Sequence, residues 1–367
     1  MLATPVAVRR RSVIIIGTQH SLDPQAIDAD PEIQFHAADG LVNFYLPGYV
    51  QGGVQRLTSS VRGRFDRENR QVIEPFVNVR EEVILALGKL ASGGTSLEVR
   101  ANGARAAGIL RGKAAVGDLL QALHSKDTGL IFESLIALQK IQDVSAAPKL
   151  SFLLRDLEPR VQIAAIETTG LLRNTAAVPD LQVVFDSGRS EKVRRAALAA
   201  LAMLAQQSSR PYFERALAQK PEGIRVAAAE GIARLKTPGD SEKMDKMFSE
   251  ERNMAPRLAA AFALVSLGRV STGQDTPLTY LVNALNSKAQ QYALAYLYEL
   301  GREGVVRKTL YEYLKAANRE EKMGIGQILA MSGGAGAVET LEWLPDPDPE
   351  VAQAGVRSLR SLKTRIP

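Results

Sequence analysis

The chain has 367 residues, of which 46% are apolar but only 5% aromatic, and it carries 46 basic against 40 acidic side chains. The absence of cysteine excludes disulfides, thiolate metal sites and cysteine nucleophiles. The positive charge is spread along the chain without a basic block, which argues against a dedicated nucleic-acid-binding surface. An apolar composition with few rings is typical of closely packed helices built from small and aliphatic residues.

The N-terminus resembles the opening of a secretory signal, because arginines at residues 9–11 precede a short apolar stretch at residues 13–16. That stretch is shorter than the apolar region of an ordinary signal peptide. We therefore expect residues 1–37 to be disordered or processed, with a degenerate export signal as the alternative. No apolar run approaches the roughly 18 residues of a membrane span. A cytoplasmic location is expected, and export is the alternative.

Residues 38–77 contain apolar residues at helical spacing, interrupted by Pro47 and Gly48, but they show no repeat. Terminal units of a repeat array must cover an apolar face that has no further neighbour. We expect this range to form a helical N-terminal cap.

The main feature of the chain is an apolar stripe that recurs at a regular interval. From an aliphatic anchor such as Val193, small or aliphatic residues follow four, eight and eleven positions later, at Ala197, Leu201 and Leu204. These offsets lie on one side of an α-helix. An early anchor at Val79 stands only 20 residues before the next one and indicates a truncated first unit or a cap. The later anchors, 31 to 33 residues apart, are Val99, Leu130, Val161, Val193, Ile224, Pro256, Ala289, Glu320 and Val351.

Each interval also contains a second predicted helix, whose start is marked in several units by a proline, at Pro148, Pro179 and Pro277. A lone helical pair of this size leaves an apolar face exposed, so neighbouring pairs must stack to bury it. The pattern predicts an all-α fold over residues 78–365. The expected architecture is an α-solenoid, a right-handed superhelix of stacked antiparallel helix pairs.

Several anchors are followed by arginine, as in Val99-Arg100, Val193-Arg194 and Ile224-Arg225. In this pattern the chain resembles HEAT-repeat proteins, which are armadillo-like solenoids, in the short form of about 31 residues found in phycobilisome-lyase-type proteins. The resemblance implies a solenoid that presents a surface to a partner. It also brings alternatives, since some short-repeat HEAT-like proteins are bilin lyases or isomerases, and one group comprises DNA glycosylases.

Residue types that catalysis requires are sparse in this chain. There are only three histidines, and none is followed by glutamate as in the iron-binding HEAT-like hydroxylases. The sequence contains no phosphate-binding loop and no serine nucleophile motif. Neighbouring carboxylates such as Glu81 and Glu82 indicate helix ends rather than an acid–base pair. We therefore predict no enzymatic activity, no metal, no cofactor and no small-molecule substrate.

The arginines that follow the anchors have two interpretations. In the first, they form a structural ladder with turn aspartates or with carbonyls of the neighbouring unit. In the second, they bind acidic groups of a partner. The candidate ladder residues are Arg80, Arg100, Arg194, Arg225 and Arg257 with Asp127, Asp156 and Asp186.

Four residues are candidates for partner binding. Arg195 stands beside a ladder arginine and is the cation without a predicted partner. Tyr292, Tyr296 and Tyr298 belong to a region rich in tyrosine, a residue that combines a large contact area with a polar tip. The alternative is that these rings fill space between two less regular units.

The sequence thus predicts a non-catalytic protein–protein interaction scaffold, whose concave solenoid surface binds a protein or peptide partner. A bilin lyase-type enzyme or accessory protein and a weak nucleic-acid-binding protein remain as alternatives. Neither a membrane span nor a nucleic-acid partner is expected.

Overall fold

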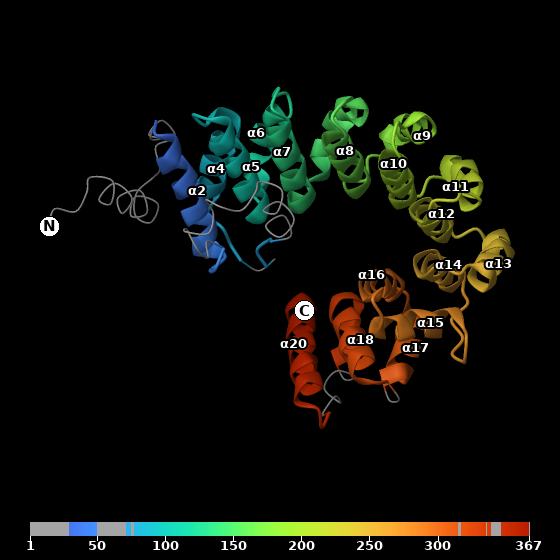
Figure 1. The fold of residues 1–367 in the computed structure, drawn as a ribbon. Coiled ribbons are helices and arrows are strands. Elements are labelled where there is room, and N and C mark those ends of the chain that lie inside the picture. Colours follow the sequence, from blue (N-terminus) through green and yellow to red (C-terminus); the bar gives the residue numbers. More distant parts are fainter. Residues whose placement is uncertain are drawn as a thin grey trace. The chain divides into compact units, whose positions relative to one another are not determined.

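The computed structural model describes residues 29–49, 71–74, 77–314, 317–334, 336–338 and 346–366. The chain divides into two compact units, Met1–Ala200 and Leu201–Pro367, called unit 1 and unit 2 below. In both units the described residues form helices and connecting turns, with no β-strand among them (Figure 1). The predicted all-α solenoid fold is therefore confirmed.

Unit 1 is a series of paired helices (Figure 1). The helices that carry the sequence anchors, called anchor helices, are α5 (Leu97–Ile109), α7 (Thr128–Ile141), α8 (Pro159–Leu171) and α10 (Glu191–Leu204), whose last turn enters unit 2. The helices paired with them, called opposing helices, are α4 (Glu81–Gly93), α6 (Val116–Ala122), η3 (Val144–Arg155) and α9 (Val178–Ser187). Short 3₁₀ turns, η2 (Lys113–Ala115) and η4 (Thr175–Ala177), precede α6 and α9.

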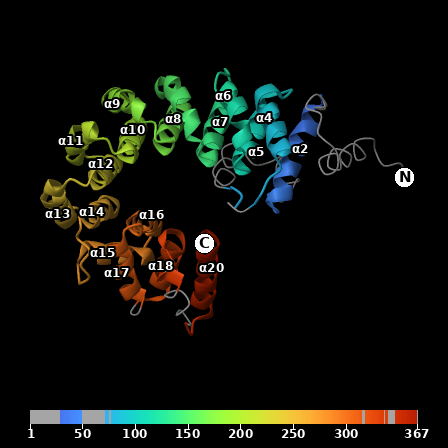
Figure 2. The same ribbon diagram turned by 180° about the vertical axis from the view of Figure 1, so that it is seen from behind.

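Unit 2 continues the same alternation, seen from behind in Figure 2. Its anchor helices are α12 (Glu222–Leu235), α14 (Met254–Ser266), α16 (Gln290–Leu300), α18 (Arg319–Ser332) and α20 (Pro349–Arg365). Its opposing helices are α11 (Arg210–Leu217), α13 (Ser241–Glu250), α15 (Pro277–Asn283) and α17 (Gly304–Leu314). The 3₁₀ turns of this unit are η5 (Gln207–Ser209), η6 (Pro238–Asp240) and η7 (Ala284–Asn286).

The anchor stripe is buried because it packs against the opposing helix of its own pair. Val99, Leu130 and Val161 are all at most 1% exposed, and the alanine four positions after Val161 is fully buried as well. Small residues at this offset let the two helices approach closely. At Gly103, a Cβ atom would lie 2.8 Å from the Cβ of Leu90 in α4, so glycine is required there.

The ends of the anchor helices repeat at the same interval as the anchors. Twelve positions after successive anchors, the backbone enters the left-handed region at Arg111 (φ 49°), Gln142 (φ 58°) and Arg173 (φ 56°). In unit 2 the same place is taken by Lys236 (φ 51°) and Gly268 (φ 98°). This conformation turns the chain out of a helix and satisfies its last carbonyls. The repeat that the side chains indicated is thus also present in the backbone.

Proline marks the opposing helices in two ways. Pro179 and Pro277 occupy the first turn of α9 and α15, as predicted. Pro148 lies inside η3, which is a 3₁₀ helix over its whole length. A proline in this interior position cannot donate the hydrogen bond that an α-helix needs.

The first repeat differs from its prediction. Val79 precedes α4, and α4 is the opposing partner of α5, so the stripe that starts at Val79 belongs to an opposing helix. The first unit is therefore a full helical pair rather than a truncated one. The short spacing between Val79 and Val99 is the spacing between two helices of one pair.

The N-terminal helix α2 (Pro31–Tyr45) packs against α4 and α5. Its Asp39 accepts a hydrogen bond of 3.1 Å from Asn102 of α5, and Ala38 and Val42 join the buried cluster. The helix begins at Pro31, before the predicted boundary at residue 38. Residues 1–28 and 50–70 lie outside the described residues, so the domain limits of the N-terminal region stay a prediction.

Candidate partner-binding surface

Two of the arginines that follow the anchors donate hydrogen bonds to the opposing helix of their own pair. Arg100 Nε lies 3.2 Å from the carbonyl oxygen of Ala91, and Arg194 Nε lies 3.3 Å from that of Phe185. Each carbonyl belongs to a residue nine positions earlier, near the end of α4 or α9. The predicted carbonyl partners therefore exist, but within a pair and not in the neighbouring one.

Two other predicted ladder residues make different contacts. Arg225 donates to the carbonyl of Gln219 at 3.1 Å, just after α11, and to the carboxylate of Glu251 at 2.9 Å, just after α13. The guanidinium of Arg257 lies 4.6 Å from the ring centroid of Tyr280 on α15, and its Nε is buried without a hydrogen-bond partner. Both arginines thus reach the pair that follows their own.

Arg80 and the predicted aspartates lie near helix ends. Arg80 precedes α4, and its Nε is 3.5 Å from Glu82. Asp127 accepts a hydrogen bond of 2.7 Å from the amide of Leu130 and so caps α7. Asp156 accepts one of 2.8 Å from the amide of Glu158 before α8, whereas Asp186 is exposed on α9. Asp127 and Asp156 thus act on backbone amides that the turn brings close to them.

The opposite side of the anchor helices defines a second surface. Residues two, six and ten positions after an anchor lie roughly 160° to 250° around the helix from the centre of the buried stripe. In unit 1, eight residues at these positions, together with Arg160 one residue before an anchor, form what we call the open face. Its residues are Arg105, Phe132, Ile136, Lys140, Arg160, Ile163, Glu167, Leu171 and Arg195.

The open face combines apolar and cationic side chains. Leu171 is 42% exposed, and Phe132, Ile136 and Ile163 are partly exposed. The guanidinium of Arg160 on α8 lies 3.6 Å from the ring centroid of Phe132 on α7, a cation–π contact between consecutive anchor helices. This surface has the composition of an interaction site, in which apolar area is flanked by arginine.

A buried charged cluster lies at one side of the open face. Arg105 on α5 holds Glu133 on α7 through two hydrogen bonds of 3.3 Å, and Glu133 is only 1% exposed. The Nζ atom of Lys140 is buried nearby and has no hydrogen-bond partner. Desolvation lowers the pKa of Lys140 to about 8. The attraction of Glu133 raises this pKa, and the repulsion of Arg105 lowers it further.

Glu167 and Arg195 form the other side of the open face. Arg195 is exposed on α10, where it was predicted to be available to a partner. Glu167 reaches solvent on α8, yet desolvation by the surrounding protein raises the pKa of its carboxyl group, and the attraction of Arg195 works against this rise.

In unit 2 the corresponding positions are occupied by a network of the protein's own side chains. Arg234 on α12 holds Glu299 on α16 through two hydrogen bonds of 2.9 and 2.8 Å. The hydroxyl group of Tyr296 on α16 donates to Glu230 on α12 at 2.7 Å, and its ring stacks on Phe262 of α14 with centroids 4.6 Å apart. The network therefore joins two anchor helices across the one between them.

The three candidate tyrosines lie in different environments. Tyr296 is 3% exposed, and its hydroxyl is already bonded, so it is buried in this network and offers no surface to a partner. Tyr292 is 50% exposed, whereas Tyr298 is partly buried, with the guanidinium of Arg302 5.1 Å from its ring centroid. A partner-binding role for Tyr292 and Tyr298 stays a prediction.

The sequence analysis missed the charged residues of both faces. Lys140 and Arg234 each lie ten positions after an anchor, and Glu167 and Glu230 each lie six positions after one. Their offset from the anchor was the feature of the sequence that could have identified these charged residues. It could show which charges share a face, but not which of them are paired.

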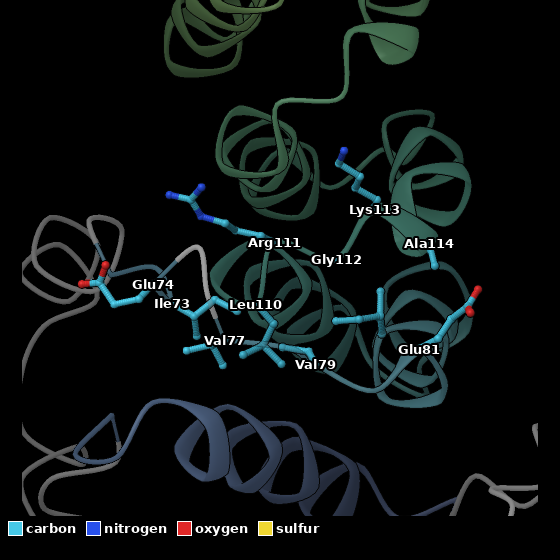
Figure 3. Close-up of a pocket in the computed structure, with 11 residues that line it drawn as sticks. Ile73, Glu74, Val77, Val79, Glu81, Leu110, Arg111, Gly112, Lys113 and Ala114 are labelled. Atoms are coloured by element: carbon cyan, nitrogen blue, oxygen red, sulfur yellow. The ribbon is translucent and has the colours of Figure 1, made fainter. Parts of the chain in front are cut away.

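A separate cavity of about 390 Å³ lies in unit 1 between the segment before α4 and the end of α5. Figure 3 shows Ile73, Val77 and Leu110 at its centre, while the charged ends of Arg111 and Lys113 lie away from these apolar side chains. Its lining groups do not converge on a common point, as catalytic groups would.

The described residues lack two other kinds of feature. No group of three or more His, Asp or Glu side chains there could hold a metal ion. None of the helices described is both long and apolar enough to span a membrane.

A family model of HEAT repeats matches residues 148–233. This part of the chain consists of HEAT repeats, and the resemblance noted from the sequence is confirmed there. A search of curated proteins found no match.

Solved structures with a similar chain include three proteins of low sequence identity. An engineered protein is 19% identical over 97% of this chain and 99% of its own, with a TM-score of 0.43. Human deoxyhypusine hydroxylase in complex with glycerol is 17% identical over 77% of this chain and 97% of its own, with a TM-score of 0.32. The complex of CpcE and CpcF of phycocyanin lyase from Nostoc sp. is 17% identical over 74% of this chain and 92% of the solved chain, with a TM-score of 0.40.

Proposed function

We propose that the protein is a non-catalytic scaffold that binds a protein or peptide partner on the open face of unit 1. The observation that carries this proposal is the exposure of apolar side chains next to cations on consecutive anchor helices. Leu171, Ile163 and Ile136 come from α8 and α7, and Arg195 adds a charge from α10. A contiguous surface of this composition is typical of an interaction site.

Affinity purification with mass spectrometry tests the proposal. The tagged full-length chain is compared with Ile163→Asp, which places a charge in the apolar centre of the open face, and with Arg195→Glu. Arg189→Glu is the matched control, because Arg189 is exposed in the turn before α10 and lies outside the open face. Partners that bind the wild type and the control but neither open-face variant support the proposal. Recovery of the same partners with all four proteins would refute the assignment of this surface.

The two alternative functions, a bilin lyase-type protein and a nucleic-acid-binding protein, predict different experimental results. A bilin lyase-type protein would change the absorbance spectrum of an added bilin. A nucleic-acid-binding protein would be retained on a DNA column at low salt and released as salt rises. We propose that the protein does neither, and a positive result in either assay would replace the scaffold with that activity.

A further inference from the structure

The open face of unit 1 carries more cationic than anionic side chains. Arg105 and Glu133 cancel one another in a buried pair. The other charged groups of the face are Lys140, Arg160 and Arg195 against the single carboxyl of Glu167. Charge complementarity therefore favours an acidic partner.

Lys140 is the most specific of these groups. Its Nζ atom is buried and makes no hydrogen bond, although an ammonium group has three donors. The charged groups near it are Glu133 on its own helix and Arg105 on α5, which are already bonded to one another. A buried cation in this state lacks an anion.

The helices packed against α7 do not supply that anion. Toward α8, the polar contact of α7 is made by Gln139, which donates to the hydroxyl of Thr168 at 3.0 Å. On α6, the carboxylate of Asp118 bonds Lys89 on α4 and is not available to Lys140. Glu167, the carboxylate of α8 on the open face, interacts with Arg195 and is not among the charged groups that act on Lys140.

In unit 2, the cation at the equivalent repeat position is paired with carboxylates. Arg234 lies ten positions after its anchor, as Lys140 does after its own. The guanidinium of Arg234 is bonded to two carboxylates, Glu299 at 2.8 Å and Glu230 at 3.4 Å. The same repeat position therefore carries a cation in both units, and in unit 2 the carboxylate of Glu230 on the same helix and that of Glu299 on α16 satisfy it.

The spacing of the face matches a helical partner. Packed helices lie about 8–10 Å apart, and residues seven positions apart on an α-helix are separated by about 10.5 Å along its axis. A helix that crosses α7 and α8 can therefore place one apolar residue against each of these anchor helices and bring carboxylates toward Arg195 on α10. Carboxylates beside this apolar stripe would then meet the cations.

We propose that the open face of unit 1 binds an acidic amphipathic helix of a partner protein, and that the partly exposed Lys140 side chain turns its buried Nζ atom outward to pair with a carboxylate of this helix. The inference rests on the proposed scaffold function and names the chemistry of its partner. Ile136, Ile163 and Leu171 receive the apolar stripe, and Arg160 and Arg195 bind carboxylates that flank it.

The test uses two synthetic peptides of about 20 residues, long enough to span about 30 Å as a helix. Both carry leucine at heptad spacing, and they differ only in having glutamate or glutamine beside the leucines. Fluorescence anisotropy with the full-length chain measures their affinities. We expect the glutamate peptide to bind at least about tenfold more tightly than the glutamine peptide, because charge-assisted hydrogen bonds are lost in the latter.

Variants of the protein locate the peptide. Lys140→Met and Arg195→Gln each weaken the glutamate peptide by about tenfold and leave the glutamine peptide unchanged. Arg189→Gln is the matched control and leaves both affinities unchanged. Arg195 is an exposed side chain, so its variant tests the proposal even if Lys140→Met alters folding. Equal affinities for the two peptides, absence of binding by both, or insensitivity to both variants would overturn the proposal.

The partner recovered by affinity purification separates this inference from the scaffold function. A partner lost in Ile163→Asp but retained in both Lys140→Met and Arg195→Gln keeps the scaffold and refutes the acidic helix. If Ile163→Asp has no effect on any partner, both proposals fail.

Discussion

The open face of unit 1 and the network of unit 2 are built on similar repeat positions of the anchor helices, but their charged side chains are paired differently. In unit 2, Arg234 finds carboxylates on two anchor helices, and Tyr296 and Phe262 stack beneath them. In unit 1, Lys140 has no partner for its ammonium group and Arg195 is exposed. The comparison teaches that a repeat position can be structural in one copy and available in another.

The largest expected effect tests whether the protein's own side chains bury the anchor-helix network in unit 2. Phe262→Ala removes a ring that is 1% exposed and is covered by Tyr296 and Arg234. The resulting cavity should lower the free energy of unfolding by about 3–4 kcal/mol. Phe132→Ala is the matched variant on the open face, where the ring is partly exposed, and should cost only about 1 kcal/mol. Urea unfolding measures both, and equal losses would contradict the difference between the faces.

The second prediction concerns the unpaired charge of unit 1. The native pKa of Lys140 is lowered to about 8 from an ordinary value of 10.5, so its charge destabilises the folded state below pH 8. Lys140→Met should therefore raise the free energy of unfolding at neutral pH by about 2 kcal/mol, allowing for the exposed part of the side chain.

The pH dependence of that difference has a definite sign. Between pH 8 and pH 10.5 the folded protein has lost the proton of Lys140 while the unfolded chain still binds it, so the wild type gains stability as pH rises. The advantage of Lys140→Met should shrink over this range in chemical unfolding experiments. A constant difference from about pH 7 to about pH 11 would show that the Lys140 ammonium is not desolvated.

A third prediction compares two carboxylates. Glu299→Gln weakens the paired hydrogen bonds to Arg234 and should cost about 1 kcal/mol, a modest value because the side chain of Glu299 is 36% exposed. Glu167→Gln should slightly stabilise the protein at neutral pH, because burial raises the pKa of Glu167 and its charged form is disfavoured in the folded state.

The effect of Glu167 also depends on pH. A raised native pKa gives stability below the ordinary value of 4.5 that is lost as pH rises through the native pKa. The gain from Glu167→Gln should therefore be present at pH 7 and absent at about pH 3.5. Thermal midpoints at the two pH values measure it, and a larger gain in acid would reverse our assignment.

A further prediction of similar size concerns the ends of the anchor helices. Arg173 and Gly268 occupy equivalent left-handed positions, at φ 56° and φ 98°. Glycine adopts this conformation without the clash of a Cβ atom. Arg173→Gly should stabilise the protein by about 0.5–1 kcal/mol, and Gly268→Ala should destabilise it by about 1 kcal/mol. Differential scanning calorimetry measures both changes in stability. If the two substitutions change the stability in the same direction, the proposed cause is wrong.

Much of the fold could be predicted from local pattern. The interval between anchors predicted the helical pairs, and Val99, Leu130 and Val161 are buried as the stripe required. The short interval at Val79 was misinterpreted because both helices of the first pair carry an apolar stripe, and an offset alone does not distinguish them.

The partners of long side chains could not be predicted in the same way. Tyr296 was a candidate for partner binding or for filling space between two units, and the sequence did not indicate that its hydroxyl reaches Glu230, 66 positions earlier in the chain. The predicted partner of Arg100 was a turn aspartate or a carbonyl of the neighbouring pair, whereas the structure shows a hydrogen bond to a carbonyl of its own pair. Such contacts depend on the distance and angle between packed helices, which the periodicity of one helix does not contain.

The sequence by itself determined most of the helices and the repeat interval from Val99 onward, because a stripe of small side chains is buried along a helix only when it recurs at the helical period. Only the tertiary structure decided which charges are neutralised. Arg234 meets carboxylates because α12, α14 and α16 bring them within hydrogen-bond distance, whereas Lys140 remains without an anion. Side-chain pairing acts over a few ångströms, and that distance is set by how the pairs stack.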